Sequence, residues 1–334
     1  MSYRHILPAL TLALAAFTGC RGGSPQPAVS TTTPVTVASA SPVAFGPAGE
    51  AGASLLGDRP LFGVAVPQPD QASLDHIEQT TGCRPTFVEI FVSVVEGMAA
   101  DALERLPVTP VLSLEPWRPR NGKVQPDVDL GATLGGALDK QYRSLARQIA
   151  NYQRPVLIRL AHEMNGSWYP WGRVDKNTPA QYTAMWKRVV SIFKQEGATN
   201  SLWIWSPNIP RGTSNIPLRS FYPGDDWVDV VGLTGYGVRE DSPEETYGDA
   251  LRQIQAFTGK KIMLTETGAQ PDSSKTRWVT AFGPWLARNP TVGGFIWFQK
   301  TPGTGANADW RFDDTPARLA AFRTTLQDGH VRCA

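Results

Sequence analysis

The apolar residues of this chain recur in short continuous runs, with helix-like stretches between many of them. Continuous apolar runs, as opposed to alternating ones, are typical of parallel strands that are covered on both faces. Eight such runs predict strands over 61–67, 85–94, 109–117, 155–163, 201–208, 228–236, 261–268 and 292–300.

Apolar residues at helical spacing separate several of these runs and predict helices over 137–152, 179–196, 245–258 and 274–288. Thr178 and Pro179 form an N-cap followed by a proline in the first turn, and Ser274 is expected to cap the last of these helices. The alternation predicts an α/β protein with a single (β/α)8 barrel. An open doubly wound sheet is the alternative, but the first run ends in VPQP and lacks the glycine-rich turn typical of that fold.

The N-terminal part of the chain has no such periodicity. An apolar run over 6–17 is too short to span a membrane and predicts a signal peptide over 1–19. Cys20 follows a small residue as in a bacterial lipobox, although Phe17 stands where that motif usually has leucine, so lipidation of Cys20 is expected. The segment 20–57 is rich in Pro, Ser, Thr, Ala and Gly and predicts a flexible tether, which leaves 58–334 as the barrel domain.

These features predict an exported protein that is lipid-anchored at the cell envelope, with a secreted or periplasmic protein as the alternative. The lipid anchor is the only membrane contact expected. If Cys20 carries lipid, Cys83 and Cys333 remain, and they form either one disulfide in an oxidising compartment or two buried thiols.

Charge and aromatic content limit the kinds of partner that the chain is expected to bind. The chain has 32 basic and 30 acidic side chains and no long basic run, so nucleic acid is not expected to bind. Its 11 tryptophans either pack in the core or present ring faces to a ligand, and only their positions can decide between these roles.

Two predicted strands end at a glutamate. The segment RLAHEMNGSW at 159–168 closes the fourth run, and TETG at 265–268 closes the seventh. A buried carboxylate is costly unless it is paired or used, and the carboxyl ends of barrel strands carry the active site. Glu163 and Glu266 are therefore expected to face each other across the barrel mouth, as glycoside hydrolysis requires. A structural ion pair is the alternative for either residue alone.

The segment 159–168 resembles the acid/base signature of glycoside hydrolase family 26, and the resemblance extends to GYG at 235–237, TETG at 265–268 and IW at 296–297. That family contains β-mannanases, mixed-linkage β-glucanases and some β-xylanases, and belongs to a clan of retaining (β/α)8 hydrolases. The resemblance covers roughly residues 60–325. It implies that Glu163 is the acid/base, that Glu266 is the nucleophile, and that Tyr236 donates a hydrogen bond to Glu266.

Arg159 and His162, which lie close to Glu163 in the sequence, are expected to support the two glutamates. A guanidinium at Arg159 would hold Glu266 in its ionised form, and His162 is expected to bind substrate, to orient Glu163 or to pack in the core. The zinc motif HExxH is incomplete because Gly166 stands in place of its second histidine. No metal and no cofactor are expected.

The remaining candidates are expected to bind sugar, because they lie at or just beyond predicted strand ends. Trp168 and Trp297 are the first choices for sugar platforms, and Asn165 is expected either to contact sugar hydroxyls or to cap the next turn. Trp186, Trp203 and Trp205 are expected in the core. The full set of candidate binding residues is Asn165, Trp168, Trp171, Trp297, Trp117 and Glu115.

The family's mannanases usually carry WFWW where this chain has WYPW at 168–171, and Pro170 is more similar to the glucan-active branch. We therefore expect a retaining, endo-acting β-glycoside hydrolase whose partner is a polysaccharide, with β-1,3/1,4-linked glucan favoured. A β-1,4-mannanase or β-xylanase is the first alternative, and a non-catalytic carbohydrate-binding envelope lipoprotein is the second. The protein is expected to be a monomer.

Overall fold

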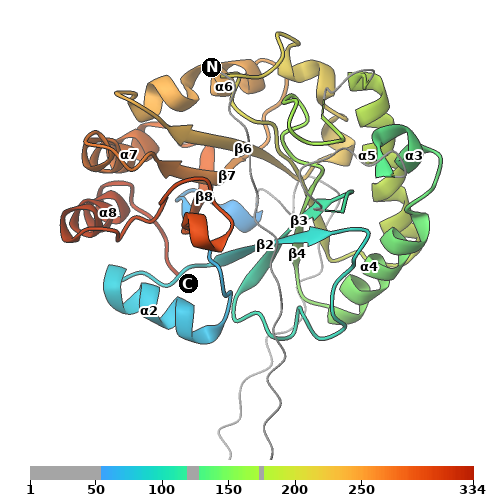
Figure 1. Cartoon of the computed structure of the whole chain (residues 1–334), viewed down its shortest axis with the longest axis horizontal. Helices are drawn as coiled ribbons and strands as arrows, with labels where there is room; N and C mark the ends of the chain where they lie inside the picture. Colours follow the sequence, from blue (N-terminus) through green and yellow to red (C-terminus); the bar gives the residue numbers. More distant parts are fainter. Residues whose placement is uncertain (1–53, 119–127, 173–176) are drawn as a thin grey trace, which may run out of the picture.

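A closed barrel of eight parallel strands forms the centre of the computed structural model, which describes residues 54–118, 128–172 and 177–334. Each strand pairs with the next in sequence, and β8 closes the barrel on β1 (Figure 1). The predicted barrel and all eight predicted strands are confirmed. The strands are β1 (Leu61–Ala65), β2 (Phe87–Ser93), β3 (Thr109–Glu115), β4 (Val156–Leu160), β5 (Ser201–Trp205), β6 (Val230–Gly237), β7 (Ile262–Ala269) and β8 (Val292–Phe298).

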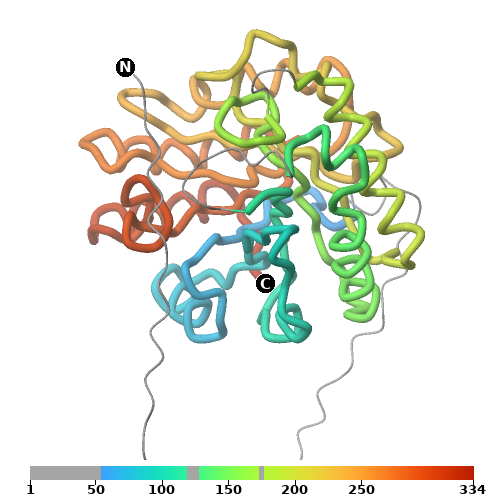
Figure 2. Tube along the Cα trace, turned by 45° about the vertical axis from the view of Figure 1, so that its right-hand side comes forward, coloured from blue at the N-terminus to red at the C-terminus, as the bar shows by residue number. Residues whose placement is uncertain are grey.

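Helices surround the barrel, as the trace in Figure 2 shows. The four predicted helices are confirmed to within about two residues at most ends. The helices are α2 (Gln71–Thr81), α3 (Leu130–Leu134), α4 (Asp139–Tyr152), α5 (Pro179–Gln195), α6 (Pro243–Gln255), α7 (Lys275–Arg288) and α8 (Pro316–Asp328). Among the described residues, no helix is long and apolar enough to cross a membrane.

The two predicted caps have different outcomes. Thr178 caps α5, since its side chain accepts from the Gln181 N–H and the Gln181 side chain accepts from the Thr178 N–H in return. Ser274 stands at the predicted N-cap position of α7, but its side chain does not cap the helix. Its backbone is already helical (φ −82°, ψ −19°), so its hydroxyl does not reach the next turn and instead lies 2.6 Å from Oδ1 of Asp272.

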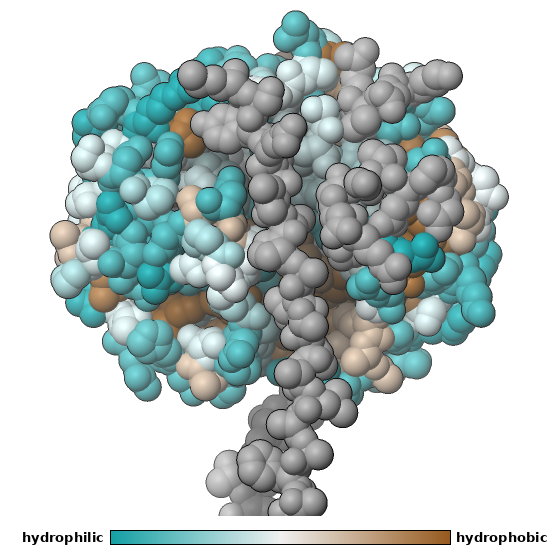
Figure 3. All heavy atoms as spheres, in the orientation of Figure 1, coloured by the Kyte–Doolittle hydropathy of each residue, from teal (hydrophilic) through white to brown (hydrophobic). Residues whose placement is uncertain are grey.

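The core has two layers. The smaller layer fills the inside of the barrel, and the larger one, which includes Trp186, Trp203 and Trp205 as predicted, lies between the strands and the helices. Leu56 is fully buried in the inner layer, so the folded part already includes residues before 58. The part of the surface that the described residues form in Figure 3 is mostly hydrophilic, with hydrophobic residues in small separate groups.

A disulfide between Cys83 and Cys333 ties the C-terminal tail to the segment before β2. The two Cα atoms are 5.3 Å apart, and the cysteines are separated by 250 residues in the chain. The tail is also held by the Arg332 N–H, which donates to the Pro60 carbonyl. Cys20, the predicted signal peptide and all but the last four residues of the predicted tether lie outside the described residues.

Candidate active site

Glu163 lies just past the end of β4, where the chain turns sharply. Ala161 (φ 43°) and Glu163 (φ 56°) have left-handed backbone conformations that residues with a side chain rarely adopt. Neighbouring strands hold both residues, because the Ala161 N–H donates to the Leu114 carbonyl (2.9 Å) and the Glu163 N–H donates to the Ser206 carbonyl (2.7 Å). Such strain is concentrated at functional sites, and here it sets the position of the Glu163 carboxyl.

The Glu163 carboxyl sits in a nearly dry environment. Its residue is only 8% exposed, and the indole N–H of Trp168 donates to its Oε2. Burial and the nearby charge of Glu266 raise the pKa of Glu163 to about 7, against the opposing effect of Arg159. The carboxyl can therefore hold a proton below neutral pH, as a general acid must.

Glu266, in β7, has a donor on each carboxylate oxygen. Nη1 of Arg159 lies 2.6 Å from its Oε1, and the Tyr236 hydroxyl donates to its Oε2 (2.7 Å). Burial and the charge of Glu266 raise the pKa of Tyr236 well above its usual value, so this hydroxyl remains a donor. Both contacts agree with those expected from the sequence, and together they fix the orientation of the Glu266 side chain.

Arg159 is fully buried in β4, and each of its nitrogens has a partner. Nε donates to the Ser206 hydroxyl (3.0 Å), and Nη2 donates to the Thr234 hydroxyl (2.5 Å). Burial lowers the pKa of Arg159, but the charges of Glu266 and Glu89 more than offset this, so the net shift is upward. The guanidinium is therefore a fixed positive charge beside Glu266.

His162 is fully buried, so the expectation that it binds substrate was wrong. Its Nε2 lies 3.2 Å from the Tyr169 hydroxyl, and its ring packs edge-on against the rings of Tyr169 and Trp171. Burial, and then the charge of Arg159, lower the pKa of His162 well below its usual value. The imidazole is therefore neutral, and it packs against the rings of Tyr169 and Trp171 inside the protein.

Trp297 does not line the mouth, contrary to prediction. Successive side chains of a strand point to opposite faces, and at this position in β8 the ring lies between the barrel and the helices, 0% exposed. Its N–H donates to the carbonyl of Trp310 (2.8 Å). The neighbouring Phe298 belongs to the inner layer instead.

Two other predicted platforms are also covered. Trp171 is 2% exposed, stacks on Tyr169 and donates to the His162 carbonyl (2.6 Å). Trp117 is 7% exposed and donates to Oε2 of Glu115 (3.1 Å). Neither ring face is free to stack on a sugar, whereas Trp168 stays partly exposed beside the Glu163 carboxyl.

Asn165 and Glu115 have mainly protein partners. The side-chain amide of Asn165 donates to the Asn208 carbonyl (2.8 Å) and accepts from the Asn208 N–H (2.9 Å), so it joins two loops instead of meeting sugar or capping a turn. Glu115 keeps a small exposed area, and burial raises its pKa to about 7. Its Oε1 lies 3.9 Å from Nε2 of His162, which is neutral, so the two do not form an ion pair.

Several residues of the mouth were missed from the sequence. Trp310 packs against Tyr236 with ring centroids 4.5 Å apart, and Phe298 lies 6.0 Å from the same tyrosine. Lys300 places its ammonium 4.7 Å from the centre of the Phe91 ring. Trp310 lies in a loop without periodicity, so no pattern could have placed it.

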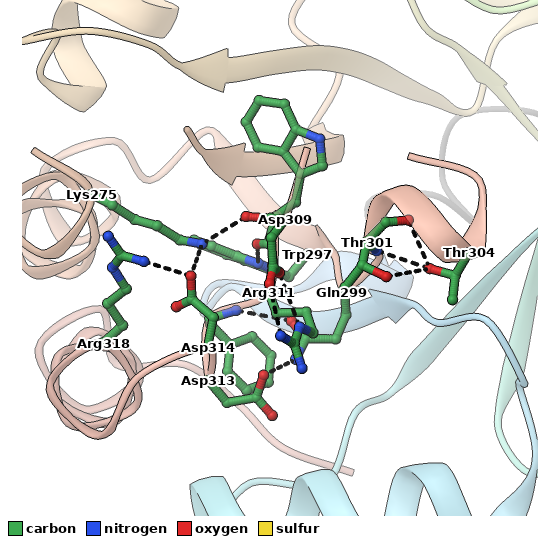
Figure 4. Close-up of polar contacts among 12 residues, drawn as sticks. Lys275, Trp297, Gln299, Thr301, Thr304, Asp309, Arg311, Asp313, Asp314 and Arg318 are labelled. Carbon is green, nitrogen blue, oxygen red and sulfur yellow. Dashed lines mark hydrogen bonds and ion pairs between the residues drawn. The ribbon is translucent and has the colours of Figure 1, made fainter. Parts of the chain in front are cut away.

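The loop that carries Trp310 is held by a polar network shown in Figure 4. Lys275, at the start of α7, donates to the Asp309 carbonyl and pairs with Asp314, both at 3.1 Å. Gln299 accepts from the Phe312 N–H (3.0 Å). These contacts fix the loop on both sides of Trp310, and Trp310 in turn packs against the tyrosine that binds Glu266.

Replacing Lys275 with methionine is expected to lower the free energy of unfolding by about 2–3 kcal/mol, because a buried carboxylate loses one of its two cations. The Lys275 side chain is 0% exposed, and Asp314 keeps its pair with Arg318. Urea unfolding measures the change. Arg277→Met, which removes an exposed ion pair from the same helix, is the control and should leave the midpoint nearly unchanged. Equal losses of unfolding free energy in the two variants would contradict the role of Lys275 as a buried cation of Asp314.

Within the described part of the chain, no group of three or more His, Cys, Asp and Glu side chains could hold a metal ion. The polar centre of the mouth instead consists of one carboxyl that can carry a proton and one carboxylate that is fixed by a cation and a phenol. Two carboxyl groups of these two kinds, at the carboxyl ends of barrel strands, are the arrangement that glycoside hydrolysis uses.

The chain is similar to known glycoside hydrolases. The sequence model of glycosyl hydrolase family 26 matches residues 126–289. Endoglucanase H of Acetivibrio thermocellus is 26% identical over 281 residues, which cover 78% of this chain and 30% of that protein. A mannan endo-1,4-beta-mannosidase of Bacillus subtilis is 32% identical over 147 residues, 42% of this chain and 37% of that protein. The chain thus spans about a third of the length of these relatives.

Solved structures show the same fold. The catalytic domain of the family 26 endo-beta-1,4-mannanase of Bacillus sp. JAMB-750 superposes with a TM-score of 0.66 at 18% identity, covering 84% of this chain and 89% of that one. The chain is therefore similar to glycosyl hydrolase family 26 in the sequence of its central part and in its fold.

Proposed function

We propose that this chain is a retaining, endo-acting β-glycoside hydrolase that cleaves a polysaccharide by double displacement. The observation that carries the proposal is the pairing of Glu266 with Arg159 and Tyr236, while Glu163 stands in a nearly dry setting beside Trp168. The two carboxyl groups thus have the different surroundings that a nucleophile and a general acid need, since a cation and a phenol hold Glu266 and Glu163 can carry a proton.

In the first step, Glu266 attacks the anomeric carbon as the bond to the leaving oxygen breaks. Glu163 gives its proton to that oxygen, and a glycosyl ester forms on Glu266. Arg159 and Tyr236 hold the Glu266 carboxylate in position for this attack. In the second step, Glu163 takes a proton from water, and the resulting hydroxide attacks the anomeric carbon and releases Glu266.

The pKa of Glu163 predicts how activity depends on pH. The general acid works only when protonated, and its pKa is raised to about 7, so kcat/KM should fall as pH rises through about 7. Glu163→Gln should cut hydrolysis of the polysaccharide by about 10²- to 10⁴-fold. Its effect on an aryl glycoside with a good leaving group should be much smaller in the first step, because that group needs no proton. If kcat/KM for the polysaccharide still falls at alkaline pH in Glu163→Gln, the fall is due to another group.

The proposed substrate is a β-linked hexose polymer, with β-glucan first. Pro170 supports β-glucan, as does the endoglucanase among the relatives, which matches 78% of this chain. β-1,4-Mannan is the second candidate, because a mannan endo-1,4-beta-mannosidase of Caldalkalibacillus mannanilyticus is 34% identical over 138 residues.

A panel of soluble mannan, mixed-linkage glucan, β-1,3-glucan and xylan would test this choice through the release of reducing ends. Rapid loss of viscosity relative to that release would establish endo action. Proton NMR of the first products should show the retained anomeric configuration, and an inverted product would overturn the double displacement. Binding of these polymers without any turnover would instead favour a non-catalytic carbohydrate-binding protein.

We also propose that the chain is exported and anchored through lipid on Cys20, with the barrel acting as a monomer. The disulfide between Cys83 and Cys333 supports an oxidising compartment. In a bacterial host fed a labelled fatty acid, the wild type should carry label in the membrane fraction, and Cys20→Ser should not. Label retained by Cys20→Ser would contradict lipidation at Cys20. Light scattering of the isolated barrel would test its monomeric state.

A further inference from the structure

A lysine at the mouth carries a positive charge that no carboxylate of the described residues contacts. Lys300 follows β8 and is partly exposed. Its Nζ has no hydrogen bond and no ion pair with any residue that the structure describes. Lys275, by contrast, has a buried ammonium that lies 3.1 Å from both the Asp309 carbonyl and the Asp314 carboxylate. The Lys300 ammonium is therefore a donor that still lacks a protein acceptor.

Two aromatic rings hold the Lys300 ammonium in place. Its Nζ lies 4.7 Å from the centre of the Phe91 ring, in β2, and 5.2 Å from the centre of the Phe298 ring, in β8. The faces of aromatic rings attract cations, but they provide no oxygen for the N–H groups. The ammonium is thus held in one place and can still donate to an oxygen of a ligand. A donor that is fixed in advance loses little entropy when it binds.

The backbone around Lys300 is fixed as well. The Lys300 carbonyl accepts from the Trp310 N–H (3.0 Å), and the N–H of the next residue, Thr301, donates to the Thr304 hydroxyl (2.8 Å). Figure 4 shows the residues on either side of Lys300, Gln299 and Thr301, each held by its own polar contacts. The position of Lys300 is therefore set before any ligand binds.

The surroundings of Lys300 favour a neutral acceptor over an anionic one. Burial lowers the pKa of Lys300, against the opposing charges of Glu89, Glu266 and Glu115. The ammonium thus loses more by leaving water than it gains from those three distant groups. An oxygen acceptor from a ligand would make up part of that loss. Because the three carboxyl groups would repel an anion, a hydroxyl suits this position better than a carboxylate.

The order of the strands indicates which part of a substrate meets Lys300. Glu163 follows β4 and gives its proton to the leaving oxygen, so the leaving part of the polymer lies on that side of the mouth. Lys300 follows β8, which is opposite β4 in the closed barrel of eight strands. Lys300 reaches Tyr236 only through the Phe298 ring, which contacts both residues. Since Tyr236 binds Glu266, this arrangement places Lys300 beyond the sugar that Glu266 attacks.

We propose that Lys300 is a specificity-determining residue that donates a hydrogen bond to a hydroxyl of a neutral sugar, the second one on the glycone side of the cut. The glycone is the part of the polymer that forms the ester with Glu266. The inference rests on the proposed function, because it assigns Lys300 to the substrate site of the same hydrolase. The contact favours substrates with at least two sugars before the cut, since binding energy from a remote sugar can lower the barrier at the reacting carbon.

Aryl β-glycosides with one common leaving group and a glycone of one or two sugars test this contact. The wild type should use the disaccharide glycoside with a higher kcat/KM than the monosaccharide glycoside. In Lys300→Met, the ratio of these two values should fall by about 10- to 100-fold, which corresponds to a hydrogen bond from a charged group. Lys300→Arg keeps the charge and the N–H donors, so its ratio should fall less. Equal losses on both glycosides in Lys300→Met would overturn the proposal.

Lys187→Met is the matched control. Lys187 also places its ammonium over an aromatic ring, 5.5 Å from the centre of the Trp227 ring. That ring lies just before β6, at the amino-terminal end of the barrel and away from the mouth. The ratio of the two kcat/KM values should be the same in this variant as in the wild type, and a fall as large as that of Lys300→Met would contradict the assignment. Circular dichroism confirms the fold of each variant.

A disaccharide glycoside whose second sugar is a uronic acid tests the choice of a neutral acceptor. The wild type should use this compound with a lower kcat/KM than the neutral disaccharide glycoside. A preference for the uronic acid that Lys300→Met removes would overturn the neutral hydroxyl as the group that Lys300 binds.

Calorimetry separates failure of this inference from failure of the proposed function. A tetrasaccharide of β-glucan, or of the best polymer of the panel, should bind Glu163→Gln about 10-fold more tightly than the double variant Glu163→Gln/Lys300→Met. If the wild type cleaves no polymer but this difference in affinity is found, the proposed function fails and Lys300 still binds sugar. If polymers are cleaved but the two affinities are equal, the proposed function stands and Lys300 has no part in binding.

Discussion

Glu266→Ala is expected to abolish turnover, with a loss in kcat on the order of 10⁴-fold or more. The variant lacks the nucleophile, and it leaves Arg159 and Tyr236 without the carboxylate that they bind. Such a loss corresponds to about 5 kcal/mol of activation free energy. Release of reducing ends from the best polymer of the panel measures it, after circular dichroism has confirmed the fold.

Azide separates loss of the nucleophile from general damage to the site. In Glu266→Ala the space of the carboxylate can admit azide, which should attack an activated β-glycoside and give an α-glycosyl azide. The control is Glu115→Ala, which removes another carboxylate near the mouth and should give no such product. Unchanged hydrolysis by Glu266→Ala would contradict the assignment of the nucleophile, and with it the double displacement.

The double variant Cys83→Ala/Cys333→Ala is expected to lose about 5 kcal/mol of unfolding free energy. The disulfide closes a loop of 250 residues that contains most of the barrel, so it restricts the unfolded chain strongly. Urea unfolding of the variant and the oxidised wild type measures the difference. Because such values often fall short of the chain-entropy estimate, a loss above about 2 kcal/mol supports the assignment.

A reductant provides the control for that measurement. Reduced wild type should unfold at the same urea concentration as the double variant, and the variant should not respond to reductant. A variant as stable as the oxidised wild type would show that the disulfide does not stabilise the barrel. The proposed site lies at the carboxyl ends of the strands and the disulfide lies before β2, so kcat should stay unchanged in the absence of urea.

The success of the barrel prediction has a simple cause. Strands covered on both faces need continuous apolar runs, so their number and order can be read along the chain. The positions of Glu163 and Glu266 follow from the same pattern, because each directly follows or closes such a run. Arg159 and Tyr236 could be anticipated since each belongs to a motif of the resemblance.

The errors concern the orientation of individual side chains. Trp297 lies one residue before the inward-facing Phe298, and a pattern that is apolar on both faces of a strand cannot reveal which face a residue occupies. Asn165 and His162 follow β4 as expected but turn toward protein partners. Their orientation depends on the left-handed turn at Ala161 and Glu163. This turn could not be predicted from the sequence, because neither of these positions is a glycine.

The sequence by itself determined the barrel, the two strand ends that carry carboxyl groups and the family resemblance, because these depend on local periodicity and short motifs. The tertiary structure alone brought Trp310 onto Tyr236 and brought Glu89 onto the guanidinium that Glu266 shares. Glu89 stands 70 residues from Arg159 in the chain and Glu266 stands 107 residues away. Glu89 and Glu266 contact the same guanidinium only in the closed barrel. Burial gives this contact its energetic weight, because the charges inside the barrel are removed from water.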